Sequence, residues 1–320
     1  MDYNVKDVID SSFEAELKYP IPELPPYVSR QTNSWSICYE EFQKAREQSN
    51  PNYDLLALHL GFYLASWGMY RGSSFLKALD YRIHYPAVKM MLEEQYRDLF
   101  AIDPLADKDQ YRELYTIDPL ENKNHYWELL FREDPSSHEK DGIYRRLYKY
   151  YGKSRAAWAA WKKNSGEASS KDEITTDTLI TKILMGVYAC IPAYDINFKK
   201  GIDFFGGCTT LKPNGKAILN IDENEPKFSL LYILQNEKLR KDLKEYADEK
   251  HFPFMKVVDM FFFGLGAAWY KEVDKDTKEK IKEEKANGEV LDERKKEIRK
   301  EIENRKNNEY GDDLSCFKNK

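Results

Sequence analysis

The longest run of the chain without an Asp, Glu, Lys or Arg extends from Leu55 to Tyr70. Its leucines and aromatic residues point in nearly every direction of a helix, which is typical of a central helix packed on several sides. Asn50 and Pro51 mark its start and Gly72 its expected C-cap. The run is shorter than the roughly 20 apolar residues that a membrane span needs. We therefore predict a buried helix of a soluble protein from about Asn52 to Tyr70.

Helical periodicity recurs along the rest of the chain. Further helices are predicted over 36–48, 176–191, 228–250 and 254–270, and the second of these ends at Pro192. Turn-forming residues around "PNGKAILNI" indicate a small hairpin near 211–221. The pattern predicts an all-α fold with a single globular helical domain.

The two ends of the chain differ from its centre. Residues 1–34 contain four prolines and are predicted to form an extended arm. Residues 35–270 are predicted to form the helical core domain. From Lys271 to Glu309 the chain is almost purely charged with alternating signs, so residues 271–320 are expected to be a charged helix or tail that contributes little to the core.

An internal repeat interrupts the core domain. "YRDLFAIDPLADKDQ" at 96–110 is followed by "YRELYTIDPLENKNH" at 111–125, by a looser copy at 126–140 and by an echo at 144–148. Each unit combines a helical spacing of Tyr and Leu with Asp-Pro, which predicts short helices joined by tight turns in an insertion over 96–148. Two interpretations stay open. The repeat is either a specific interaction surface or the result of a tandem duplication that lengthened a peripheral part of the chain.

The chain as a whole is slightly acidic, and only one segment is strongly basic. The formal net charge is −5 and the pI about 5.8, unlike a uniformly basic nucleic-acid-binding protein. Residues 144–163 nevertheless combine bases with aromatic rings, which suit phosphates and exposed bases. A solvated amphipathic helix would show the same pattern. The candidate nucleic-acid-binding residues are Arg145, Arg146, Lys149, Lys153 and Arg155.

Common catalytic signatures are missing. The chain contains no HExxH, Walker A, GxGxxG or GxSxG motif, and its five histidines lack zinc-ligand spacing, so no metal or cofactor is predicted. Its four cysteines form no CxxC pair and the N-terminus does not resemble a secretory leader, which indicates the cytoplasm.

Four charged residues stand out because they lie in or beside the most apolar segments: Arg71, Lys182, Asp195 and Asp259. A charge in such a place needs a partner. We predict that Arg71 and Asp195 lie near each other, with Gly72 and Ser73 forming an anion or substrate cradle beside the guanidinium. The alternative is a purely structural Arg–Asp pair.

Two segments carry a resemblance. "LALHLGFYLASWGMYRGSSFL" and "TKILMGVYACIPAYD" resemble paired segments of a widespread bacterial family of uncharacterised proteins, over roughly residues 52–90 and 175–270. The order of Thr-Lys, apolar helix, Pro and Tyr-Asp is also similar to helix-hairpin-helix DNA glycosylase-like proteins. That resemblance implies an all-α fold in which Asp195 assists bond cleavage, although the chain lacks the Leu-Pro-Gly-x-Gly hairpin that grips DNA phosphate in that fold.

Two classes of function follow. The favoured one is a non-enzymatic interaction protein that binds a protein or nucleic-acid complex, because no nucleophile, base or metal constellation stands out. The other is a DNA glycosylase-like enzyme directed at nucleic acid. A role in conflict between phage and bacterial host is compatible with either, no membrane partner is expected, and the oligomeric state is open.

Overall fold

The computed structural model describes residues 4–13, 30–72, 74–100, 125–165, 177–205, 230–234, 236–285 and 292–313. Every regular element in these ranges is helical, so the protein is all-α as predicted. The α-helices are α1 (Val5–Phe13), α2 (Arg30–Ala45), α3 (Tyr53–Ser66), α4 (Tyr85–Met91), α6 (His125–Phe131), α7 (Ile143–Asn164), α8 (Asp177–Val187), α9 (Ile196–Asp203), α11 (Leu230–Ile233), α12 (Glu237–Lys250), α13 (Phe254–Lys285) and α14 (Asp292–Asp313). The 3-10 turns are η1 (Phe75–Ala78), η2 (Tyr81–His84), η3 (Glu94–Phe100) and η4 (His138–Lys140).

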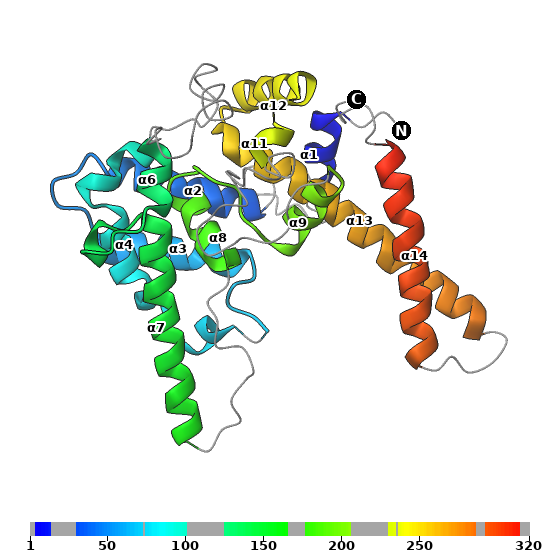
Figure 1. The fold of residues 1–320 in the computed structure, drawn as a ribbon, viewed down its shortest axis with the longest axis horizontal. Helices are drawn as coiled ribbons and strands as arrows, with labels where there is room; N and C mark the ends of the chain where they lie inside the picture. Colours follow the sequence, from blue (N-terminus) through cyan, green and yellow to red (C-terminus); the bar gives the residue numbers. More distant parts are fainter. Residues whose placement is uncertain are drawn as a thin grey trace, which may run out of the picture.

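The helices share one hydrophobic core from α1 to α14. Helices α2, α3, α4, α7 and α8 form one side of the body, and α1, α9 and α12 gather around the first half of α13 (Figure 1). Two parts extend beyond this body in the same view, the C-terminal half of α7 and the pair formed by the end of α13 with α14 (Figure 1).

Helix α3 begins at about the predicted residue but ends earlier than predicted. Its N-cap is Asn52, whose side chain accepts a hydrogen bond from the backbone N–H of Leu55. It ends at Ser66 because Gly68 adopts a left-handed conformation with φ of 78°. The N–H of Met69 then bonds to the carbonyl of Leu64, which closes the helix in a Schellman motif. The predicted C-cap, Gly72, lies beyond this turn.

Helix α3 is packed on several sides as predicted, but the prediction that it is buried is wrong for one face. Leu55, Leu58 and Phe62 are 42, 45 and 51% exposed. Their neighbours Leu56, Leu60 and Leu64 are fully or nearly fully buried. Helices α2, α4 and α8 and the turn η2 pack against α3 from several directions and leave its outward face open.

Helices α9 and α13 approach each other unusually closely. A Cβ atom added to Gly201 of α9 would lie 1.9 Å from the carbonyl oxygen of Phe262. One added to Gly266 of α13 would lie 1.9 Å from the carbonyl oxygen of Asn197. Because only glycine lacks a Cβ, these two positions let the backbones of the two helices touch.

The ends of the chain also differ from expectation. Residues 5–13 form helix α1, with Val8 and Ile9 buried against the core, so this part of the predicted arm is not extended. Helix α14 packs on α13 through a narrow apolar seam that buries Ile298, Ile302 and Tyr310. The charged C-terminal segment therefore contributes more to the core than predicted. The expected hairpin at 211–221 and residues 101–124 of the repeat insertion lie outside the described residues.

Among the described helices, none is by itself long and apolar enough to cross a membrane. Helices α12 and α13 meet that measure only when taken together, and the chain bends by 114° between them.

Candidate functional site

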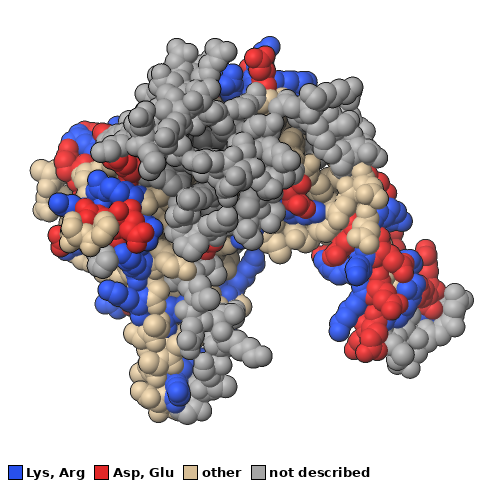
Figure 2. Space-filling view, viewed as in Figure 1, with Lys and Arg blue, Asp and Glu red and all other residues tan. Residues whose placement is uncertain are grey.

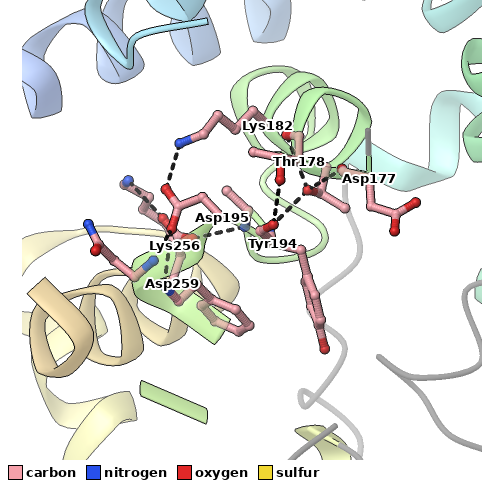
Figure 3. A network of polar contacts seen from close by, with 11 residues as sticks. Asp177, Thr178, Lys182, Tyr194, Asp195, Lys256 and Asp259 are labelled. Atoms are coloured by element: carbon pink, nitrogen blue, oxygen red, sulfur yellow. Dashed lines mark hydrogen bonds and ion pairs between the residues drawn. The ribbon is translucent and has the colours of Figure 1, made fainter. Parts of the chain in front are cut away.

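Two buried Lys–Asp pairs lie where α8, α9 and α13 meet, and we call these four residues the buried tetrad (Figure 3). Lys182 of α8 donates from Nζ to Oδ2 of Asp195 at 2.8 Å. Lys256 and Asp259 of α13 are three residues apart, with Nζ 3.5 Å from Oδ2. The four side chains are between 1 and 13% exposed. Charges so far from water are stable only with partners, and here each lysine faces a carboxylate.

Both carboxylates also accept hydrogen bonds from backbone N–H groups. Asp195 is the N-cap of α9, and its Oδ1 accepts from the N–H groups of Asn197 and Phe198 at 3.1 and 3.0 Å. Asp259 accepts from the N–H of Ala193 at 2.8 Å. The tetrad thus joins the loop between α8 and α9 to α13.

Two indole rings complete the surroundings of the lysines. The Nζ of Lys182 lies 4.6 Å from the centre of the Trp67 ring. The Nζ of Lys256 lies 5.1 Å from the Trp67 ring and 4.9 Å from the Trp35 ring. Cation–π contacts of this kind stabilise an ammonium group that has lost its water.

Burial shifts the pKa values of Lys256 and Asp259. It lowers the pKa of the Lys256 ammonium despite the nearby Asp259, and it raises the pKa of Asp259. Both shifts favour the neutral forms, as expected for groups moved from water into a low dielectric.

The loop that carries Asp195 is held by threonines of α8. Thr178 Oγ1 donates to the carbonyl of Tyr194 at 2.8 Å, and Thr181 Oγ1 accepts from the N–H of Tyr194 at 2.9 Å (Figure 3). Ala189 turns the chain out of α8 with a positive φ of 51°. The position of Asp195 is therefore set from both sides, by α8 and by its own cap of α9.

The structure pairs Asp195 differently from the prediction. Its ionic partner is Lys182, and in the part of the chain that the structure describes neither Asp195 nor Asp259 contacts Arg71. Arg71 and Gly72 are exposed, and the Arg71 guanidinium lies against Gly68. Ser73 lies outside the described residues. The expected cradle of Arg71, Gly72 and Ser73 is therefore not assembled around Asp195.

This arrangement indicates a structural role for the tetrad. The oxygens of Asp195 are engaged by Lys182 and by the first turn of α9, and the groups around them are packed side chains. The described pocket of about 340 Å³ is formed elsewhere and shares no residue with the tetrad. It is lined by Glu94, Gln95, Tyr96, Asp98, Glu128, Leu129, Arg132 and Asp141.

Three of the candidate nucleic-acid-binding residues are engaged by acids of the same protein. Arg145 forms an ion pair with Glu133. Arg146 forms a bidentate ion pair with Glu93, and its side chain is 13% exposed. Lys149 pairs with Asp141, whose side chain is fully buried. The first half of α7 therefore uses its bases to fasten the helix to the body.

The second half of α7 is different, and we call residues 153–164 the distal α7 (Figure 1). Lys153 and Lys163 are exposed and form no ion pair within the described ranges. Trp161 is 60% exposed. The helix contains no acidic residue, and Figure 2 shows basic and uncharged surface but no acidic surface along this projecting part.

The remaining candidate, Arg155, faces inward. It is 7% exposed, and its guanidinium lies 6.0 Å from the centre of the Phe75 ring. Of the five bases nominated from the sequence, only Lys153 lies on an open surface without an acidic partner.

No group of His, Cys, Asp and Glu side chains suited to a metal ion occurs in the described ranges. No family model, curated protein or solved structure matches the chain.

Proposed function

We propose that the protein is a cytoplasmic, non-enzymatic interaction protein that binds nucleic acid through the distal α7. The observation that carries this proposal is the exposed side chain of Trp161 on the distal α7, where Lys153 and Lys163 are also exposed and no residue is acidic. The helix projects from the body, so a long polymer can lie along it apart from the acidic side chains on the body and on the other arm (Figure 2).

The chemistry of the distal α7 suits a polyanion with exposed rings. Lys153 and Lys163 offer ammonium groups to phosphates, and neutralising phosphates releases counterions. Trp161 offers a flat ring on which an unpaired base can stack. Trp158 is half-buried, and the Nζ of Lys162 lies 4.7 Å from the centre of its ring. Trp161 is therefore the ring that we expect to contact a base.

The test compares two variants with the same change of charge. Lys153→Ala with Lys163→Ala removes two bases from the distal α7, and Lys241→Ala with Lys244→Ala removes two exposed bases from α12. Binding to single-stranded and duplex DNA and RNA is measured by fluorescence anisotropy over a range of salt concentrations. We expect the α7 variant to lower the salt slope by about 1.4 to 1.8, since each phosphate contact contributes about 0.7 to 0.9.

The α12 variant is expected to bind like the unchanged protein. Trp161→Ala should weaken single-strand binding by roughly 5- to 150-fold, the range expected for loss of one stacked base. Absence of binding to every nucleic acid at low salt would contradict the proposal. So would equal losses in the α7 and α12 variants, which would reveal a diffuse effect of net charge.

A further inference from the structure

An apolar surface lies on the hairpin of α2 and α3, away from the distal α7. Ile37, Leu55, Leu58 and Phe62 are 46, 42, 45 and 51% exposed. They are four of the six large hydrophobic side chains that are exposed among the described residues. We call these four residues the α2–α3 patch.

Helices α2 and α3 pack side by side and run antiparallel. Ser34 near the start of α2 lies 2.5 Å from Ser66 at the end of α3, oxygen to oxygen. Glu41, further along α2, lies near His59 of α3. Ile37 lies between Ser34 and Glu41, which places it beside the Phe62 end of the α3 stripe.

The outward face of α3 carries no charge from Leu55 to Ala65. Leu55, Leu58, Phe62 and Ala65 are spaced by three or four residues and are all exposed. Exposed helices of monomeric proteins usually present charged or polar residues on this face. A continuous apolar surface of this kind is typical of an interface.

The ends of this face carry opposite charges. Asp54, exposed in the first turn of α3, has its carboxylate bonded only to the hydroxyl of Tyr81 within the described ranges. Arg71 is exposed at the other end, with its guanidinium against Gly68 just after the helix. A second α3 laid antiparallel over the first would bring Asp54 of each copy opposite Arg71 of the other, whereas a parallel arrangement would oppose like charges.

We propose that the α2–α3 patch binds a second copy of this chain, with the two α3 helices antiparallel about a two-fold axis. The two hairpins would form a four-helix arrangement with Leu58 and Phe62 at its centre. Each surface is then its own complement, as a two-fold interface requires. The exposed acids Asp54 and Glu40 lie on the same two helices as the patch, which disfavours an anionic lipid surface as the occupant.

The size of the patch sets the strength of the association. Helix α3 has 14 residues and is about 21 Å long. Two adjacent helices are about 18 Å wide, so the footprint is roughly 400 Å² per copy. A standard interface covers about 800 Å² per partner, so we expect a reversible dimer with a dissociation constant of about 10 to 100 µM.

Sedimentation equilibrium of the full chain from about 1 to 300 µM tests the proposal, over a range chosen to span that constant. We expect a monomer–dimer equilibrium that Leu58→Glu shifts by at least about 30-fold, because a charge replaces a central anchor. The matched control is Ile196→Glu, since Ile196 is 65% exposed on α9 and lies outside the patch. Circular dichroism shows whether each variant keeps its helices.

Charge reversal tests the antiparallel orientation. Asp54→Arg and Arg71→Asp each place like charges opposite one another in their own dimer and should weaken it by about 3- to 30-fold. When the two variants are mixed, opposite charges face each other at both ends, so heterodimers should form. A protein that stays monomeric at about 300 µM overturns the proposal, as does a dimer that Leu58→Glu leaves unchanged. Failure of the mixed variants to associate would overturn the antiparallel arrangement.

Discussion

Replacing Asp195 by Asn removes the charge that faces Lys182 and keeps a side chain that can still cap α9. The perturbation is specific because the Lys182 side chain is only 3% exposed and its ammonium donates to Asp195 at 2.8 Å. Without the carboxylate, a buried positive charge remains beside Lys256, which is also buried. The variant therefore isolates the ionic part of the contact from its capping part.

The expected loss follows from these contacts. Removing one partner of a buried ion pair costs about 3 to 5 kcal/mol. We expect the lower end, about 3 kcal/mol, because the Trp67 ring 4.6 Å away still stabilises the ammonium. Asp195→Ala should cost roughly 0.5 to 2 kcal/mol more, since it also removes the cap of α9. Lys182→Met combined with Asp195→Asn should recover most of the loss, because no buried charge is left unpaired.

Urea unfolding followed by circular dichroism measures these free energies. The slope with denaturant should stay constant across the series while the midpoint moves. If Asp195→Asn left the free energy of unfolding within about 0.5 kcal/mol of the unchanged protein, the pair would not contribute as the structure implies. A double variant no more stable than Asp195→Asn alone would also refute the reasoning.

Three other predictions concern separate parts of the molecule. Burial lowers the pKa of His84 to about 3, below its unfolded value, so its contribution to stability is present above about pH 6.5 and is lost as the pH falls toward 3. Titration of His84 should lower the free energy of unfolding by up to roughly 4 to 5 kcal/mol across this window. The His84→Gln variant should not show this fall, and an unchanged pH profile would contradict the prediction. Gly201→Ala should lower the free energy of unfolding by about 3 kcal/mol or more, measured by urea unfolding, because its Cβ would overlap the backbone of α13. Tyr310→Ala should speed hydrogen exchange in α14, because it removes the stack on Phe204 with ring centres 5.2 Å apart, and unchanged exchange there would show that the stack does not hold the helix.

Local patterns in the sequence predicted the helices well. The run 176–191 contains α8, and the run 254–270 covers the first part of α13, which continues to Lys285. Helix α8 ends at Val187, earlier than the predicted stop at Pro192. The all-α fold follows from this periodicity. The end of α3 was misplaced because Gly68 and Gly72 are both suitable helix terminators, and the choice between them depends on the packing of the turn that follows.

Contacts between distant residues were beyond the reach of the sequence. Lys182, Asp195 and Asp259 stand out as charges in apolar segments, yet which lysine meets which carboxylate depends on how α8, α9 and α13 cross. Lys256 was missed, although its spacing of three from Asp259 was a usable signal. For the same reason, nothing near Arg146 in the sequence shows that Glu93 neutralises it.

The close contact of α9 with α13 has a mechanical consequence. Gly201 and Gly266 clamp backbone to backbone near the middle of a helix of 32 residues. Beyond Gly266, α13 continues without interruption to Lys285 and carries α14 with it. This length is about 29 Å, so a tilt of about 5° at the clamp would move the tip by about 2.5 Å. The stack of Tyr310 on Phe204 and the hydrogen bond from Lys200 to Asn307 tie α14 back to the end of α9, so these contacts resist such a tilt. Changes of packing beside the buried tetrad would therefore reach the charged arm only as far as these contacts yield.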